Sequence, residues 1–421
     1  METPAHWRLR FLDGLRGVAI TQVVMSTYLA AFHPLTQPVP LFQDSSLANT
    51  FLAMISDGYS GICMFLAVSG FALTRTYDGS HAPVGRLLAG RAVRLALPAL
   101  AAVLLGAAVA GLLPGVPRAA AAWTGSPLLA ALFPIDPAPE PLVRDAAVAF
   151  FLGYNGSSAA ADLLTAYHHW LLPHAGRLNF PLMDSFNPAL WSLCLQTSGS
   201  LVVIVLIAAR RAGIRLWLVL VTAAGTCLAM TPLAALLAGH VLARLRSSTE
   251  ASLPAAVAWP GLLLGTWLCL GPFPELPAAF ARFCAGPGPD LTACGDPGHL
   301  TKIAGTVLIF LTCTICPPLQ RLLARFPLTF LGRLSLPIYL SHVPAIGGIC
   351  SAALLAFRLP AGAERSLLVA LVAITAVTIF TALLRPLDIL TSKAGHAIAF
   401  PRHPLRETKA PRLRRPNPGN R

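Results

Sequence analysis

Residues 10–32 read RFLDGLRGVAITQVVMSTYLAAF, and this stretch indicates the class of the fold. From Val18 to Phe32 it is mainly apolar, and basic residues precede it. Gln22 and Ser26 are four residues apart, so on a helix they share one face. Inside a bilayer a polar face is expensive unless it turns toward other helices. The stretch therefore predicts a membrane-spanning helix that belongs to a bundle.

The composition of the whole chain agrees with a membrane protein. Of 421 residues, 55% are hydrophobic and 11% are charged, and the mean hydropathy is +0.67. A soluble protein carries about 25% charged residues, so this chain has too few to cover a water-facing surface. The net charge of +14 would suggest a nucleic acid partner in a soluble protein. The positions of the charges along the chain argue otherwise.

Further apolar runs follow the first one, and a crossing helix needs about 20 mostly apolar residues. The clear runs lie near Val18–Phe32, Gly61–Leu73, Val93–Leu113, Leu193–Ala209, Ala255–Leu270, Ile303–Cys316, Leu336–Phe357 and Ser366–Leu384. The stretch Leu216–Leu242 is too long for one span and is interrupted at Thr231-Pro232, which predicts two short helices joined by a tight turn. We expect an all-α polytopic membrane bundle of about ten transmembrane helices.

Basic residues divide the predicted loops into two classes. With ten spans, 24 of the 31 Lys and Arg fall on one side of the membrane, which has a net charge of +18, and the other side has −4. Short cytosolic loops carry the basic excess in membrane proteins. Both termini are therefore expected in the cytosol. The lipid bilayer is the expected partner, and no nucleic acid partner is expected.

The same division suggests a domain plan. Residues 1–390 are expected to form the transmembrane domain, with an extracytosolic cap at about 113–189. Residues 391–421 are basic and contain several prolines, which predicts a cytosolic tail on an anionic leaflet.

Two features on the predicted extracytosolic side concern covalent modification. Asn155 begins an Asn-Gly-Ser glycosylation sequon in the cap. Cys284 and Cys294 share a later loop and form either a disulfide or two free thiols. Cys313 and Cys316 have a metal-like spacing, but they lie in an apolar run without a second pair, where cysteines pack as small hydrophobic residues.

Four further motifs follow the first in a fixed order. They are VSGF at 68–71, RAVRLALP at 91–98, NPALWSLCLQTSGS at 187–200 and LGRLSLPIYLSH at 331–342. Together with LDGLRGVA in the first run, they resemble the acyltransferase-3 family of integral membrane O-acyltransferases, particularly its fungal members. The resemblance covers about Arg10 to Leu384.

This resemblance implies a function. Members of the family form a ten-helix bundle that moves an acyl group from cytosolic acyl-CoA to a hydroxyl, often on a carbohydrate or a small lipophilic molecule. Acyl-CoA is thus an expected co-substrate and partner, beside a hydroxyl-bearing acceptor, and no bound cofactor is expected. A His removes the hydroxyl proton, and a carboxylate orients that His.

The family's two catalytic positions are substituted in this chain, according to the resemblance. Arg16 matches the basic residue that precedes the His, but the His position is Thr27 and the Glu position is Gln196. Thr has no proton-accepting state near neutral pH, and Gln carries no charge. Loss of a positioned base costs roughly 10²–10⁴-fold in rate.

Two histidines are weak substitutes for the missing base. His342 matches a family position, where it either lines the cavity or makes a hydrogen bond within the bundle. His33 follows Thr27 by six residues, roughly 240° around a helix, and so lies on another face. No carboxylate or thiolate set accompanies the histidines, so no metal site is expected.

Arginines in the motifs are candidates for binding the CoA phosphates. A guanidinium matches a phosphate in a bidentate way, although Arg16, Arg91 and Arg94 also fit the basic anchoring of cytosolic loops. Asp13 lies three residues before Arg16 in the first motif. The candidates for the substrate site are Asp13, Arg16, Ser69, Arg91, Arg94 and Trp191.

The sequence leaves two functions open. The first is a membrane O-acyltransferase that uses a different polar group as its base. The second is a catalytically inactive relative that binds or translocates acyl-CoA or a lipophilic ligand. The arginine motifs favour a ligand cavity in both cases, and the missing His and Glu favour the second. Endomembrane and plasma membrane locations are not distinguished.

Overall fold

The computed structural model describes residues 4–34, 47–78, 80, 82–133, 142–143, 145–146, 185–229, 231–248, 254–271, 299–358 and 362–400. Every regular element within these ranges is a helix, which confirms the all-α prediction. Asn155, Cys284, Cys294, residues 401–421 and most of the predicted cap lie outside the described residues.

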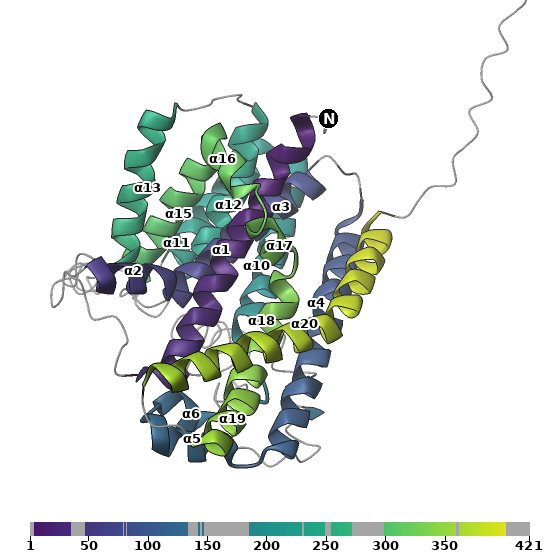
Figure 1. The fold of residues 1–421 in the computed structure, drawn as a ribbon. Coiled ribbons are helices and arrows are strands. Elements are labelled where there is room, and N and C mark those ends of the chain that lie inside the picture. The colour runs from purple at the N-terminus through teal and green to yellow at the C-terminus, as the bar shows by residue number, and fades with distance from the viewer. Residues whose placement is uncertain are drawn as a thin grey trace, which may run out of the picture.

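The helices follow one another along the chain as shown in Figure 1. They are α1 (Pro4–Phe32), α2 (Leu47–Ile55), α3 (Gly58–Tyr77), α4 (Val84–Leu112), α5 (Val116–Thr124), α6 (Pro127–Ala131), α10 (Leu190–Ala212), α11 (Ile214–Leu228), α12 (Leu233–Ser248), α13 (Ala255–Cys269), α15 (Leu300–Ile315), α16 (Pro317–Leu323), α17 (Leu328–Arg333), α18 (Ser335–Pro344), α19 (Ser351–Phe357) and α20 (Ala363–Ala399). A π-helical turn, Ala345–Cys350, joins α18 to α19.

Each apolar run predicted from the sequence is helical in the structure. The interruption at Thr231-Pro232 is confirmed, because α11 ends at Leu228 and α12 begins at Leu233. Five helical segments are long and apolar enough to cross a membrane, or six if α15 and α16, bent by 100° at their junction, form one span. The five are Arg10–Phe32, Val84–Leu112, Leu190–Ala212, Ser335–Phe357 and Glu364–Ala399.

The count of ten spans stays a prediction. Of the shorter helices, α11 and α13 have 15 residues each and α12 has 16. At 1.5 Å per residue they reach about 24 Å at most, which is less than the roughly 30 Å of a hydrocarbon core. These three helices are therefore shorter than the hydrocarbon core, unlike the five long segments.

The bundle is organised around α1 and α3. Helices α10, α12 and α15 pack against α3, and α17 and α18 pack against α1. The longest helix, α20, has 37 residues, about 55 Å. It passes obliquely across α18 and then runs beside α4 (Figure 1). It continues beyond the predicted domain boundary at residue 390 and ends at Ala399.

The polar face predicted for the first helix is turned inward. The Gln22 side-chain amide donates to the Met54 carbonyl oxygen of α2 at 2.8 Å. The Ser26 side chain packs against Gly58 at the start of α3. This face therefore contacts the α2–α3 segment, as the rule for polar residues in bilayers requires.

Glycines of the motifs allow α1 to approach the segment from α16 to α17. A Cβ on Gly14 would collide with the carbonyl oxygen of Leu323, and one on Gly17 would collide with that of Leu328. From the other side, a Cβ on Gly332 would collide with the Asp13 carbonyl oxygen. Small residues at helix crossings permit such close backbone contact in membrane proteins. The LDGLRG motif and the later LGR motif are thus two halves of one helix crossing.

A histidine of α12 is part of a buried hydrogen-bond chain. The Trp217 indole N–H donates to His240 Nε2 at 3.0 Å, which leaves the proton of the neutral ring on Nδ1. His240 Nδ1 lies 2.7 Å from Thr74 Oγ1, and the Thr74 hydroxyl donates to the Gly70 carbonyl oxygen at 2.7 Å. Both His240 and Thr74 are fully buried. His240 therefore serves the packing of α3, α11 and α12.

Candidate functional site

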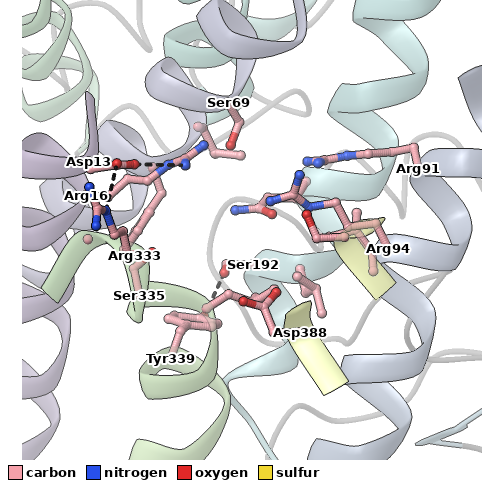
Figure 2. A pocket seen from close by; sticks show the side chains of 18 of the residues that line it. Asp13, Arg16, Ser69, Arg91, Arg94, Ser192, Arg333, Ser335, Tyr339 and Asp388 are labelled. Carbon is pink, nitrogen blue, oxygen red and sulfur yellow. Dashed lines mark hydrogen bonds and ion pairs between the residues drawn. The ribbon is translucent and has the colours of Figure 1, made fainter. Parts of the chain in front are cut away.

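Seven helices, α1, α3, α4, α10, α17, α18 and α20, line a cavity of about 400 Å³, and each of the five motifs contributes residues to it. Its polar and charged lining consists of Asp13, Arg16, Ser69, Arg91, Arg94, Ser192, Gln196, Arg333, Ser335, Tyr339, Asp388, Ser392 and Lys393. Five of these side chains are basic and two are acidic, so the cavity is strongly positive. Figure 2 shows arginines on opposite sides of the open space.

Asp13 of α1 lies between two of these arginines. Its Oδ1 is 3.8 Å from an Arg16 Nη atom, and its Oδ2 is 3.7 Å from Arg333 Nε. The Asp13 side chain is 29% exposed, so these ion pairs are partly solvated and individually weak. The pair with Arg333 joins α1 to α17 at the edge of the cavity, close to the crossing at Gly332.

Arg91 of α4 is connected to α10. Its Nε–H donates to Ser200 Oγ at 2.9 Å, and the Ser200 hydroxyl in turn donates to the Gln196 carbonyl oxygen. Arg94 lies three residues later on the same face of α4 and also lines the cavity. One helix face thus presents two guanidinium groups, and a residue of α10 orients the first.

A buried pair of hydroxyl groups forms another part of the cavity wall. The Ser192 hydroxyl donates to Tyr339 Oη at 2.7 Å, and Tyr339 Oη donates to the Ala189 carbonyl oxygen. The Tyr339 ring packs against Phe65, with 6.4 Å between the ring centroids. These contacts hold the tyrosine in place between α10 and α18.

Asp388 enters the cavity from α20, near Tyr339 and Ser192 (Figure 2). Within the part of the chain that the structure describes, its carboxylate forms no hydrogen bond and no ion pair within 4 Å. It lies within electrostatic range of Arg94 and Arg16. The sequence prediction missed this residue because the last predicted span ended at Leu384. The sequence does contain a signal for it, because Asp388 is an isolated acidic residue within the apolar run Leu387-Asp388-Ile389-Leu390.

The two family positions do not meet at this cavity. Gln196 is among its lining residues, and among the described residues Thr27 is not. The Thr27 hydroxyl donates to the Val23 carbonyl oxygen of its own helix at 3.1 Å. Thr27 also lies 11 residues from Arg16, about 16 Å along α1.

Both histidines considered as substitutes lie apart from the described cavity lining. His342 is 2% exposed, and its Nδ1 is 2.6 Å from the Tyr339 carbonyl oxygen, so it makes a hydrogen bond within α18. His33 follows the end of α1, about 25 Å along the helix from Arg16. Burial lowers the pKa of His33, and the nearby charge of Arg365 lowers it further.

Of the six substrate-site candidates, five share the cavity: Asp13, Arg16, Ser69, Arg91 and Arg94. The sixth, Trp191, is packed against the hydrophobic core and is absent from the described lining. Cys313 and Cys316 are buried free thiols. The described residues contain no group of three or more His, Cys, Asp or Glu placed to hold a metal ion.

Two further hollows adjoin the site. A smaller cavity of about 140 Å³ lies between α3, α4 and α20, and it shares Arg16, Ser69, Arg91 and Arg94 with the first. An apolar groove of about 380 Å³ lies between α1, α17, α18 and α20. Helix α18 separates this groove from the main cavity, because Tyr339 faces the cavity and Ile338 faces the groove.

Comparison with known proteins adds one match. A family model described as an acyltransferase domain, Acyl_transf_3, matches residues 9–385. No curated protein and no solved structure matches the chain.

Proposed function

Because the chain belongs to the acyltransferase-3 family and is an integral multi-pass membrane protein, we propose that it transfers an acyl group from acyl-CoA to a hydroxyl group. The acceptor is a carbohydrate or a small lipophilic molecule. The proposal extends the general membrane acyltransferase assignment of the family to a named donor and acceptor class.

The observation that carries the proposal is the positive cavity. CoA is a polyanion, and arginines bind phosphates through paired hydrogen bonds. The cavity has five basic side chains and two acidic ones, and Arg91 and Arg94 face Arg16 across the open space (Figure 2). The buried Ser192 and Tyr339 hydroxyls provide an uncharged region beside them for the thioester.

The orientation of the chain is part of the proposal. Ten spans with both termini in the cytosol would place 24 of the 31 basic residues on the cytosolic side. In that arrangement Asp13, Arg16, Arg91, Arg94 and Arg333 all belong to the cytosolic half of the bundle. The donor would then enter from the compartment that contains acyl-CoA.

Asp388 is the general base of the proposed transfer, and its carboxylate accepts the proton of the acceptor hydroxyl. The oxygen forms a bond to the acyl carbon, the carbon–sulfur bond breaks, and the CoA thiolate leaves and takes up the proton from Asp388. The support is positional. Asp13, the other carboxylate of the described lining, lies between Arg16 and Arg333, while Asp388 faces the open space (Figure 2). A positioned general base contributes about 10²–10⁴-fold in rate.

A second candidate is an inactive relative that only binds acyl-CoA or a lipophilic ligand. It is favoured by Thr27, whose hydroxyl is committed to its own helix, and by the uncharged Gln196. Installing Thr27→His together with Gln196→Glu tests this candidate. Acyl transfer by the double variant, when the unchanged protein has none, would favour the inactive relative.

Two measurements on the protein in lipid nanodiscs test the main proposal. The first is binding of acyl-CoA, and the second is transfer of the acyl group to simple alcohols and sugars. Arg94→Gln should weaken acyl-CoA binding by about tenfold, because a charge-assisted hydrogen bond is lost. Arg86→Gln is the matched control, since Arg86 lies on the same helix, is exposed and is absent from the described cavity lining. Equal binding by the two variants, or no transfer to any acceptor, would count against the proposal.

A further inference from the structure

Three aromatic rings border the smaller cavity where α3 and α20 end. Tyr77 is in the last turn of α3, and His396 and Phe400 are at the end of α20. The Phe400 ring centroid lies 5.8 Å from that of Tyr77 and 5.0 Å from that of His396. Tyr77 is buried, whereas Phe400 is partly exposed and His396 is exposed. The cluster therefore has a fixed base and accessible ring surface.

This cluster is directly joined to the arginine centre. Arg16, Arg91 and Arg94 line both the smaller cavity and the main one. The junction depends on a close crossing of α4 and α20, where a Cβ on Gly90 would collide with the Gly395 carbonyl oxygen. Gly395 precedes His396, so the same crossing that brings the helices together places the rings beside Arg91.

We propose that the smaller cavity and its aromatic rings bind a purine nucleotide, namely the adenosine 3′,5′-bisphosphate end of CoA. The purine ring lies against Phe400 and His396, and the phosphates contact Arg91 and Arg94. This inference rests on the proposed function, because it takes acyl-CoA as the donor.

The order of the groups along the two cavities matches the order of groups in CoA. Aromatic rings offer a stacking surface for the base, the arginines follow, and the Ser192–Tyr339 pair lies in the main cavity beyond them. A donor lying in this order has its diphosphate at the arginines and its thioester near Asp388. Neither cavity alone offers both the rings and the hydroxyl pair.

Binding measurements with three ligands test the inference on the full-length protein in nanodiscs. The ligands are CoA, adenosine 3′,5′-bisphosphate and 4′-phosphopantetheine, which lacks the nucleotide. Phe400→Leu should weaken binding of the first two by about tenfold, the loss typical of a base–aromatic stack. It should leave 4′-phosphopantetheine binding unchanged. Phe357→Leu is the control, because Phe357 is 60% exposed on α19 and absent from the described lining of either cavity.

His396→Gln supplies a second variant that removes a ring at an exposed position and keeps the helix. This variant should weaken binding of CoA and of adenosine 3′,5′-bisphosphate by a smaller factor than Phe400→Leu does. Unchanged nucleotide binding in both variants, with CoA still bound by the unchanged protein, would overturn the inference and leave the proposed function standing. Failure of the unchanged protein to bind CoA at all would overturn both.

Discussion

The Nε–H of Arg91 donates to Ser200 Oγ over 2.9 Å, and this contact joins α4 to α10 beside the main cavity. The two residues are 109 positions apart in the chain. Ser200 also donates to the backbone of its own helix, so its oxygen is fixed before Arg91 binds to it. Arg91 is thereby held with its guanidinium along the wall that contains Arg94.

Ser200→Ala should weaken acyl-CoA binding by about fivefold. A hydrogen bond of this kind contributes about 1 kcal/mol, and without it Arg91 samples rotamers that point away from the phosphate. Titration of acyl-CoA onto the protein in nanodiscs measures the effect. Ser198→Ala is the matched control, since the Ser198 hydroxyl binds carbonyl oxygens of its own helix. A Ser200 variant that binds as tightly as the control would contradict the positioning role.

Asp388→Asn should reduce the turnover number by about 100-fold, in the range for loss of a general base. Acyl-CoA binding should stay the same or become tighter, because a negative charge near Arg94 and Arg16 is removed. Steady-state kinetics with the acyl donor varied separates the two effects. Asp388→Glu, which retains the carboxylate, should recover part of the rate. Weaker donor binding in Asp388→Asn at an unchanged turnover number would instead identify a purely structural residue.

Gly332→Ala should destabilise the protein by about 1–3 kcal/mol, the usual cost of overpacking. The added methyl group would collide with the Asp13 carbonyl oxygen across the α1–α17 crossing. Thermal unfolding in detergent measures the loss. Gly85→Ala is the control, because no atom lies within 4 Å of a Cβ at that position. If both variants unfold at the temperature of the unchanged protein, the crossing is looser than described.

Lys302→Met should also destabilise the protein, by about 1–3 kcal/mol, because it leaves the buried Asp57 carboxylate without its cation. Lys302 Nζ lies 2.9 Å from Asp57 Oδ1, and the Asp57 side chain is 8% exposed. Asp57 also caps α3 by accepting from the Ser60 backbone N–H at 3.2 Å. Lys302→Arg should retain most of the stability. Equal unfolding temperatures for Lys302→Met and the unchanged protein would show that the ion pair contributes nothing.

Much of the helical architecture could be predicted from hydropathy. The break between α11 and α12 was predicted because proline interrupts a helix, and the structure confirms it. The end of the last helix was placed too early, at Leu384, before Arg385 and Pro386. The helix continues through both residues to Ala399, packed against α4.

The candidate site could be predicted in part. Arg16, Arg91 and Arg94 stand in motifs whose spacing indicated a shared role, and they line one cavity. Asp388 was missed, and His342 was left between two roles until the structure gave it a hydrogen bond within its own helix. Spacing along one helix reports which side chains share a face, but it contains no information about which other helix that face meets.

The sequence by itself determined the helical class, the membrane environment, the family and the arginines available for an anionic ligand. Hydropathy and charge determine the helical class and the membrane environment locally, because transfer of a segment into a bilayer depends on its own residues. The family follows from the order of the five motifs. Only the tertiary structure decided which charged groups share a cavity, since that depends on the rotation and approach of helices distant in the chain. Gly332 against Asp13 and Gly90 against Gly395 set those crossings, and so Asp388 and Gln196 reach the arginines while Thr27 is absent from the described lining.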